Sequence, residues 1–412
     1  MDNLTHSLVG LALGELVDRA LPAPSDPARG RTRRRLLLAT GLLASNFPDL
    51  DLVLTPLLPA PLGYLIHHRG HTHTLLYALP QVALLLAMLW LLWPGARRLV
   101  REDGRTRRAV VATALLGMVL HLSFDALNVY GVHPFHPFDS RWLYGDLVFI
   151  VEPVFWTALG VAVALPRGPR LRWPLLAFFA AAPLVFTWLG FLQWGSLALL
   201  AAIGLAVGAA HHRCGGRAGL LTACALCLGF VGVQGLAGVQ ARAQVRAALA
   251  QLAPGARVFD IPLSSFPANP LCWSFATVSE DAAGGNGPGN YAVRVGVLSL
   301  APGLSPVASC PVRFGGQPGS EQPALAWKFS QTRSVAEFRA LQRNNCHFDA
   351  WLRFARVPAL AGGVATDVRF GAPDQPNFST LPYAERQGTP CPAPLPGWGY
   401  PRADLLGWDR PG

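Results

Sequence analysis

Eight long apolar runs alternate with short polar gaps through the first 239 residues, and this pattern restricts the fold more than any other feature. The runs are Leu4–Leu21, Leu36–Leu54, Thr74–Trp93, Ala109–Tyr130, Leu147–Leu165, Pro174–Gln193, Ser196–Ala210 and Gly219–Val239. A membrane-spanning helix needs about 20 mostly apolar residues, and most of these runs approach that length. Only 14% of the residues are charged, against about a quarter in soluble proteins. We therefore predict an α-helical polytopic membrane protein with about 7–8 transmembrane helices.

Two of the runs have a second interpretation. Glu15 and Asp18 weaken the first run as a membrane span, so it is alternatively an amphipathic helix at the membrane surface. The run 196–210 is short for a span, which indicates a tilted or re-entrant segment.

Arginines gather in four of the gaps and set the expected orientation. Sixteen arginines lie within residues 29–35, 97–108, 167–172 and 213–217. The opposite gaps hold only Arg69 and Arg141. Since basic loops face the cytoplasm, the start of the first run and the region after the last run should lie outside. This topology accounts for the net charge of +11, so we expect no nucleic-acid partner.

The character of the chain changes near Gln240. Short runs typical of β-strands follow, at Tyr291–Leu300 and Leu325–Phe329, broken by Gly/Pro-rich turns. Ser334–Asn344 is typical of a helix. We therefore expect a transmembrane domain over residues 1–239 and a C-terminal extracytoplasmic domain, α+β or mostly β, over residues 240–412.

Four cysteines fall in the predicted outer domain, at Cys272, Cys310, Cys346 and Cys391. An even number of cysteines in an oxidising compartment favours one or two disulfides. The three pairings remain open at this stage.

Carboxylate and imidazole groups crowd into one short segment between the second and third runs. They are Asp49, Asp51, His67, His68, His71 and His73. Asp49 and Asp51 are two positions apart, so they point to opposite faces if the segment is extended. The two carboxylates can bind the same ion only if the segment curls into a turn. Otherwise each of them would bind a different ion. Gly70 gives the histidine-rich loop freedom to bring its imidazoles together.

Other segments bring the same residue types to the same predicted face. His6 lies at the start of the first run, and His121 and Asp125 are an i, i+4 pair on one helical face. The loop 131–146 adds His133, His136, Asp139 and Asp146. We expect a metal site with the ligands His6, Asp49, Asp51, His68, His73, His121 and Asp125, and with His71 as a second choice. His67, His133 and His136 are alternatively structural residues or partners of the ligands.

Imidazole together with carboxylate favours zinc, with manganese or iron as alternatives. The number of ligands suffices for one to three ions. Such ions activate water for hydrolysis. The expected general base is a carboxylate that does not bind the ion, either Asp146 or, if it is not a ligand, Asp125. Arg69 or Arg141 could hold an anionic substrate oxygen, and Arg69 is the residue chosen for this role; contact with a lipid headgroup is the alternative.

These motifs resemble a known family. MDNLTHSLVGLALG, SNFPDLD, HHRGHTHT, HLSFDALNVYG and the segment ending at Asp146 look like the bacterial inner-membrane-associated, metal-dependent hydrolases of the LexA-regulated type. The motifs lie in order within residues 1–155, with Thr74 where the family usually has Ser. The order of ligands also resembles, more distantly, that of zinc-dependent phospholipase C. These resemblances imply a multi-spanning metalloenzyme and raise the expectation of a phosphodiester substrate.

We therefore expect a multi-pass protein of the bacterial inner membrane with a periplasmic C-terminal domain. Its expected function is metal-dependent hydrolysis of an ester or phosphoester bond in a membrane lipid or lipid-linked substrate. The alternative is a metal-binding protein without catalysis, either a divalent-cation transporter or a sensor or assembly factor. The oligomeric state stays open.

Overall fold

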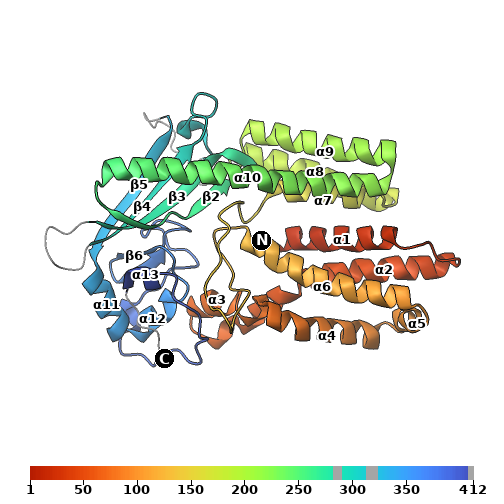
Figure 1. Ribbon diagram of the computed structural model, residues 1–412, viewed down its shortest axis with the longest axis horizontal. Helices are drawn as coiled ribbons and strands as arrows, with labels where there is room; N and C mark the ends of the chain where they lie inside the picture. The colour runs from red at the N-terminus through yellow and green to blue at the C-terminus, as the bar shows by residue number, and fades with distance from the viewer. Residues whose placement is uncertain (282–289, 312–322, 407–412) are drawn as a thin grey trace.

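The computed structural model describes residues 1–281, 290–311 and 323–406, and its first part is a bundle of helices (Figure 1). The elements before residue 253 are α1 (Asn3–Ala20), α2 (Pro27–Ala44), the 3-10 helix η1 (Phe47–Leu57), α3 (Leu62–His67), the 3-10 helix η2 (His71–His73), α4 (Leu75–Leu92), α5 (Pro94–Glu102), α6 (Gly104–Ala126), α7 (Pro153–Ala164), α8 (Pro169–Trp188), α9 (Trp194–Cys214) and α10 (Gly216–Leu252). Each of the eight predicted apolar runs overlaps a helix of this bundle.

Six segments of the described chain are long and apolar enough to cross a membrane. They are Pro27–Leu57, Leu75–Leu92, Gly104–Ala126, Pro169–Trp188, Trp194–Cys214 and Gly216–Leu252. The predicted fold class is confirmed, but with six candidate spans rather than 7–8. The difference lies in α1, which carries Glu15 and Asp18, and in α7, which has only 12 residues.

Helix α1 nevertheless lies inside the bundle, where it packs against α2, α6 and α7. Gly10 and Gly41 allow α1 and α2 to touch, since a Cβ on Gly10 would lie 2.2 Å from the carbonyl oxygen of Gly41. The buried carboxylate of Glu15 pairs with Arg19 at 2.8 Å and with Arg34 of α2 at 3.0 Å. The charge of α1 is thus compensated within the bundle, and the crossing brings its first turn close to the end of α2.

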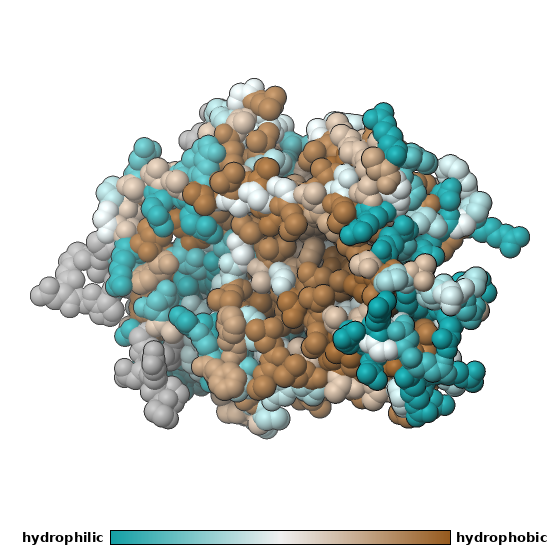
Figure 2. Space-filling model, turned by 45° about the vertical axis from the view of Figure 1, so that its right-hand side comes forward, coloured by the Kyte–Doolittle hydropathy of each residue, from teal (hydrophilic) through white to brown (hydrophobic). Residues whose placement is uncertain are grey.

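The arginine-rich segments lie at one end of the bundle and the C-terminal domain at the other. In Figure 1, α5 and the α9–α10 connection lie at the right and the β-sheet at the left. Figure 2 shows a broad hydrophobic surface between a hydrophilic region at the right and the mixed surface at the left. This distribution is the one expected for helices that cross a bilayer between two aqueous ends.

The C-terminal region is built on a five-stranded antiparallel sheet. Its elements are β1 (Arg257–Asp260), β2 (Leu263–Phe266), β3 (Asn269–Asp281), β4 (Asn290–Ser299), the 3-10 helix η3 (Val307–Ser309), β5 (Leu325–Ser334), α11 (Val335–Asn344), α12 (Cys346–Leu352), β6 (Pro358–Ala361), β7 (Val364–Asp367), the 3-10 helix η5 (Ala384–Arg386) and α13 (Ala403–Leu406). The strand order is β1-β3-β4-β5, with β2 paired to β3. β6 and β7 form a separate hairpin.

Helix α10 connects the two parts without a break. It has 37 residues and passes the predicted boundary at residue 239. Ala241 and Val245 of α10 pack on one face of the sheet, against Trp273, Phe275 and Leu298. Alternation along β3 and β4 leaves the other face of the sheet turned toward the outer loops of the bundle.

Those outer loops share a hydrophobic core with the C-terminal region. Leu62 and Ile66 of α3 and Trp142 belong to the same buried cluster as Trp351 and Trp398. The indole nitrogen of Trp398 donates to the carbonyl oxygen of Ile66 at 2.9 Å. The C-terminal region therefore covers the loops in which the candidate ligands lie.

Two disulfides crosslink the C-terminal region. They join Cys272 to Cys310 and Cys346 to Cys391, which selects one of the three pairings left open by the sequence.

Candidate metal centre

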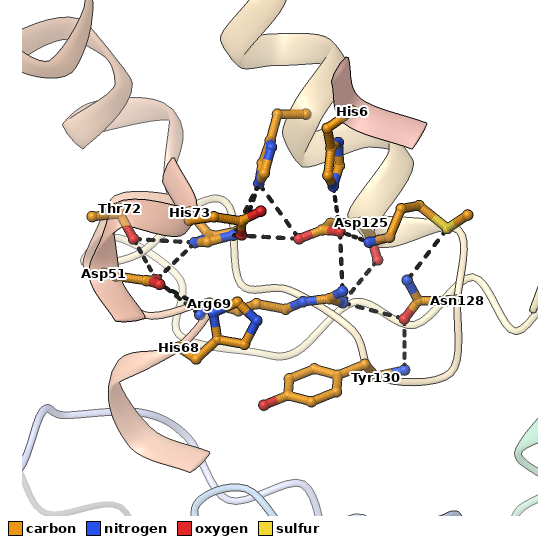
Figure 3. A network of polar contacts seen from close by, with 12 residues as sticks. His6, Asp51, His68, Arg69, Thr72, His73, Asp125, Asn128 and Tyr130 are labelled. Carbon is orange, nitrogen blue, oxygen red and sulfur yellow. Dashed lines mark hydrogen bonds and ion pairs between the residues drawn. The ribbon is translucent and has the colours of Figure 1, made fainter. Parts of the chain in front are cut away.

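The candidate ligands come from four elements whose ends meet on the side of the bundle covered by the C-terminal region. His6 lies in the first turn of α1, Asp49 in η1, His73 in η2, and His121 with Asp125 in the last two turns of α6. Figure 3 shows several of these side chains converging around Asp125. The predicted meeting of distant segments at one point is therefore found in the structure.

Asp49, His73, His121 and Asp125 form the larger of two groups of candidate ligands. Each offers one ligand atom, and these atoms all lie within 4.8 Å of one another. The side chains of His73, His121 and Asp125 are at most 1% exposed and that of Asp49 is 10% exposed. Two carboxylates and two neutral imidazoles are a donor set that suits zinc, manganese or iron.

The backbone fixes the orientation of His121. Its Nδ1 lies 2.7 Å from the carbonyl oxygen of Ser45, at the end of α2. Since a carbonyl oxygen only accepts, Nδ1 carries the proton and Nε2 presents a lone pair. That Nε2 lies 3.0 Å from Nε2 of His73 and 3.6 Å from a carboxylate oxygen of Asp49.

Asp51 orients His73 in the same way. Its Oδ2 lies 3.1 Å from Nδ1 of His73 and accepts hydrogen bonds from the Thr72 hydroxyl at 2.7 Å and from the Arg69 backbone N–H at 3.0 Å. Its Oδ1 lies 3.0 Å from Nδ1 of His68. Nε2 of His73 consequently faces the group of four ligand atoms. Two bare imidazole nitrogens and two carboxylates aimed at one point repel one another unless a cation lies between them.

In the metal-free cluster a proton can take that place. Burial by itself lowers the pKa of His73, but its contacts with the carboxylates of Asp125, Asp49 and Asp51 raise the pKa to about 10. Binding of a metal at His73 therefore displaces a proton.

The two oxygens of Asp125 have different partners. Oδ1 contacts the Met1 amino group, Nη2 of Arg69 at 3.0 Å and Nε2 of His6 at 3.3 Å. Oδ2 lies 3.3 Å from Nε2 of His73 and forms no hydrogen bond with the described residues. Oδ1 is thus held by cationic and imidazole groups, while Oδ2 points into the cluster.

Arg69 is buried and does not lie at the surface where lipid headgroups would contact it. Its side chain is 2% exposed, and its Nη1 also reaches the side-chain oxygen of Asn128 at 3.2 Å. The guanidinium carbon lies 4.4 Å from the centre of the Tyr130 ring. Figure 3 shows this ring below Arg69. Arg69 also has a φ of 59°, which is uncommon for a residue other than glycine and is a feature of functional sites.

The local fold explains how Asp49 and Asp51 both take part. The segment forms a 3-10 helix, so the curled turn that the sequence required is present. A second group of candidate ligand atoms, from Asp49, Asp51 and His68, also lies within 4.8 Å. Because Asp51 is fully engaged by hydrogen bonds, we assign it the orienting role in the first group and a direct role only if a second ion binds.

His6 lies at the edge of the cluster. Its ring stacks on that of His121, with 3.9 Å between the ring centres. Its Nε2 contacts Asp125, while its Nδ1 is buried without a partner among the described residues. The structure thus brings His6 to the site, but outside the two groups that could share an ion.

His71 and the predicted base Asp146 are not brought into the cluster. The ring of His71 packs against Tyr77, His136 and Trp398. The carboxylate of Asp146 forms a bidentate pair with Arg356 at 2.8 and 2.9 Å, so it points to the C-terminal region. The expectation of a general base at Asp146 does not fit this placement.

His133 and His136 surround Trp398 with His71. The ring centres of His133 and Trp398 are 4.0 Å apart. His133 is fully buried, and burial lowers its pKa to about 3, so its ring is neutral. These histidines therefore hold the C-terminal tail against the bundle, in line with the structural alternative considered for His133 and His136.

Sequence reasoning missed the groups that position the ligands. Asn3 donates to Oδ2 of Asp49 at 2.8 Å, Thr72 supports Asp51, and Ser45 holds His121 through its carbonyl oxygen. Asn3 and Thr72 lie within the recognised motifs, next to candidate ligands, which is the one signal that could have found them. A backbone carbonyl such as that of Ser45 leaves no signal in residue type.

Comparison with known proteins found a relative and a family. The chain is similar to the uncharacterized protein YfhP of Bacillus subtilis (strain 168), with 31% identity over 165 residues, which are 40% of this chain and 46% of the relative. The match therefore spans about half the length of that relative. No solved structure matches the chain.

The family comparison covers more of the chain. Residues 1–238 match the model described as YdjM inner membrane protein, and this range contains all the candidate ligands. The match confirms the membrane family to which the motifs pointed, whereas hydrolase activity and the likeness to zinc-dependent phospholipase C stay predictions. This multi-pass membrane protein belongs to the YdjM inner membrane protein family.

Proposed function

We propose that this protein is a metal-dependent hydrolase that cleaves an ester or phosphoester bond of a membrane lipid or lipid-linked molecule at the periplasmic face. The observation that carries the proposal is the convergence of Nε2 of His73, Nε2 of His121 and the carboxylates of Asp49 and Asp125. Asp51 and the Ser45 carbonyl hold the two imidazoles by Nδ1, which turns both Nε2 atoms toward the carboxylates. An ion can bind there once His73 gives up its proton.

A bound divalent ion would supply Lewis-acid activation of water and of a substrate oxygen. The protein contributes the orientation of its ligands through Asp51 and the Ser45 carbonyl. Arg69 holds Asp125 in place and adds positive charge next to the cluster. In hydrolysis, water adds across the ester bond: its hydroxyl joins the acyl or phosphoryl group, and its second proton goes to the departing alkoxide.

His68 is the group best placed to accept a proton during this step. Its Nδ1 donates to Asp51, so Nε2 is left with a lone pair. Its side chain is 12% exposed, more than that of His73 or His121. An imidazole oriented by a carboxylate is the usual arrangement of a general base.

The periplasmic orientation is part of the proposal. The sixteen arginines of the bundle gaps favour a cytoplasmic position for that end, and two disulfides in the C-terminal region favour an oxidising compartment. A reporter fused at residue 103 should show a cytoplasmic location, and a reporter fused at residue 250 a periplasmic one. The opposite result would invert the orientation.

The rival function is metal binding without catalysis. A transporter needs ligands near the middle of its helices, along a path through the bundle. Here the cluster comes from helix ends and two 3-10 turns. Zinc flux into vesicles that depends on His121 would favour the transporter instead.

Metal content and hydrolysis test the enzyme proposal directly. The purified protein should hold transition metal in stoichiometric amount, and His73→Ala should lose both the metal and the hydrolysis of phospholipids or generic phosphodiesters. His212→Ala, which changes an exposed histidine at the end of α9, is the matched control and should keep both. If the His73→Ala variant keeps its metal, the proposed metal centre is wrong.

A further inference from the structure

A cavity of about 740 Å³ lies between the β-sheet and the outer loops of the bundle. Its sheet wall includes Ser274 of β3, Val295 of β4 and Phe329 of β5. The facing wall includes Asn128 and Tyr130 from the segment that follows α6. The volume is within the usual range of ligand pockets, about 300–1,000 Å³.

The cavity reaches the candidate metal centre through direct contacts. The ring of Tyr64, which lines the cavity, lies 4.9 Å from the ring of His68. Tyr130 lies under the guanidinium of Arg69, and Asn128 accepts a hydrogen bond from it. A molecule in the cavity would therefore be separated from the cluster by a single layer of side chains.

The charged side chains that line the cavity are basic. None of the lining residues in the described part of the chain is acidic, and the two basic ones are Lys328 and Arg369. Arg369 is neutralised by Asp367 at 2.7 Å. Lys328 is half-buried and has no ion pair with a described residue, and burial lowers its pKa. It is also the only lysine of a chain with 33 arginines.

The rest of the wall is mostly aromatic and aliphatic, with Phe149 and Ile150 at the start of the chain segment that leads into α7. This places one side of the cavity beside a helix of the bundle. The hydroxyl of Tyr130 is buried without a hydrogen-bond partner among the described residues. An unpaired cation, a free hydroxyl and an apolar wall together suit a ligand with an acidic head and a hydrocarbon chain.

We propose that this cavity binds an anionic phospholipid of the membrane, with its acidic group at Lys328 and an acyl chain along the apolar wall. This inference rests on the proposed function in one respect, that the bound lipid is presented to the metal centre as substrate. The binding itself needs no metal. Lys328 then acts as a specificity residue that selects acidic over zwitterionic lipids.

The test uses the full-length protein in detergent with phosphatidylglycerol that carries a photoreactive group on an acyl chain. After illumination, mass spectrometry should find crosslinks on β4 and β5, and chelation of metal should not remove them. Lys328→Met should lower this labelling about tenfold, the effect of losing a hydrogen bond to a charged group. Lys328→Arg should restore it. Arg343→Gln removes an exposed charge from the same region and should change nothing.

Two further comparisons make the test decisive. Ser274→Trp fills the cavity and should block labelling, while phosphatidylcholine with the same photoreactive chain should label the strands weakly. Crosslinks confined to the spanning helices, or equal labelling by both lipids with no effect of Lys328→Met, would overturn the inference. Labelling of β4 and β5 without hydrolysis by the metal-loaded protein would instead refute the proposed function and leave the lipid site standing.

Discussion

Replacement of the carboxylates one at a time tests the division between ligands and orienting residues. Asp49→Asn keeps the size of the side chain but replaces a charged oxygen donor in the group of four ligand atoms. Asp51→Asn instead weakens four contacts, from Thr72, His73, His68 and the Arg69 N–H, which hold the imidazoles in place.

The expected losses differ in size. Changes in groups that orient a ligand typically cost about 10–100-fold in metal affinity, which is about 1.4–2.7 kcal/mol. We therefore expect a loss in this range for Asp51→Asn. Asp49→Asn removes the charge of a ligand itself and should exceed about 100-fold. Asp139→Asn alters an acidic residue whose only ion pair with a described residue is with the exposed Arg141, and it should leave affinity unchanged.

Zinc competition with a chromogenic chelator measures these affinities in detergent, and elemental analysis of the dialysed proteins checks the stoichiometry. A larger loss for Asp51→Asn than for Asp49→Asn would show that Asp51 is a ligand and that our assignment is reversed. If all three variants bind zinc as tightly as the unchanged protein, the assignment of a metal centre at these residues is wrong.

The remaining predictions concern protons, the domain contact and the disulfides. Since the pKa of His73 is about 10 without metal, zinc binding at pH 7 should release about one proton. Zinc affinity should therefore rise about tenfold per pH unit toward pH 10. Calorimetry in buffers with different ionisation enthalpies measures the proton release, and no release would mean that His73 is already neutral. Arg356→Met should leave Asp146 with the 3.2 Å pair to Arg242 as its one remaining ion pair among the described residues. The change should destabilise the protein by about 3–5 kcal/mol in thermal unfolding while metal content persists. Replacement of Cys272 and Cys310 by Ser should cost about 2–4 kcal/mol, and an unchanged melting temperature would contradict it.

Local sequence patterns predicted the parts of the site that depend on residue type and helical spacing. The i, i+4 pair of His121 and Asp125 needs only the periodicity of α6, and the position of His73 follows from a motif rich in histidine. The apolar runs likewise determine the helices, because a bilayer accepts only backbone whose hydrogen bonds are satisfied internally.

Long-range pairing is what local patterns could not supply. Asp146 was a reasonable candidate base from its neighbours, yet its partner Arg356 lies 210 residues later in the chain. The cavity has the same origin, because its walls come from the loop after α6 and from a sheet that begins more than a hundred residues further on. Such contacts depend on how α10 docks the sheet, and no local pattern encodes that.

Because α10 is uninterrupted, it fixes the position of the C-terminal sheet relative to the bundle. A helix of 37 residues is roughly 55 Å long, and each residue added to it turns everything beyond by about 100°. A one-residue insertion just before Arg242 would swing the sheet around the helix axis and separate its cavity from the candidate metal cluster. An insertion of seven residues, close to two full turns, would nearly restore the angle but lift the sheet by about 10 Å. The length of α10 thus fixes where the proposed lipid cavity lies relative to the candidate ligands.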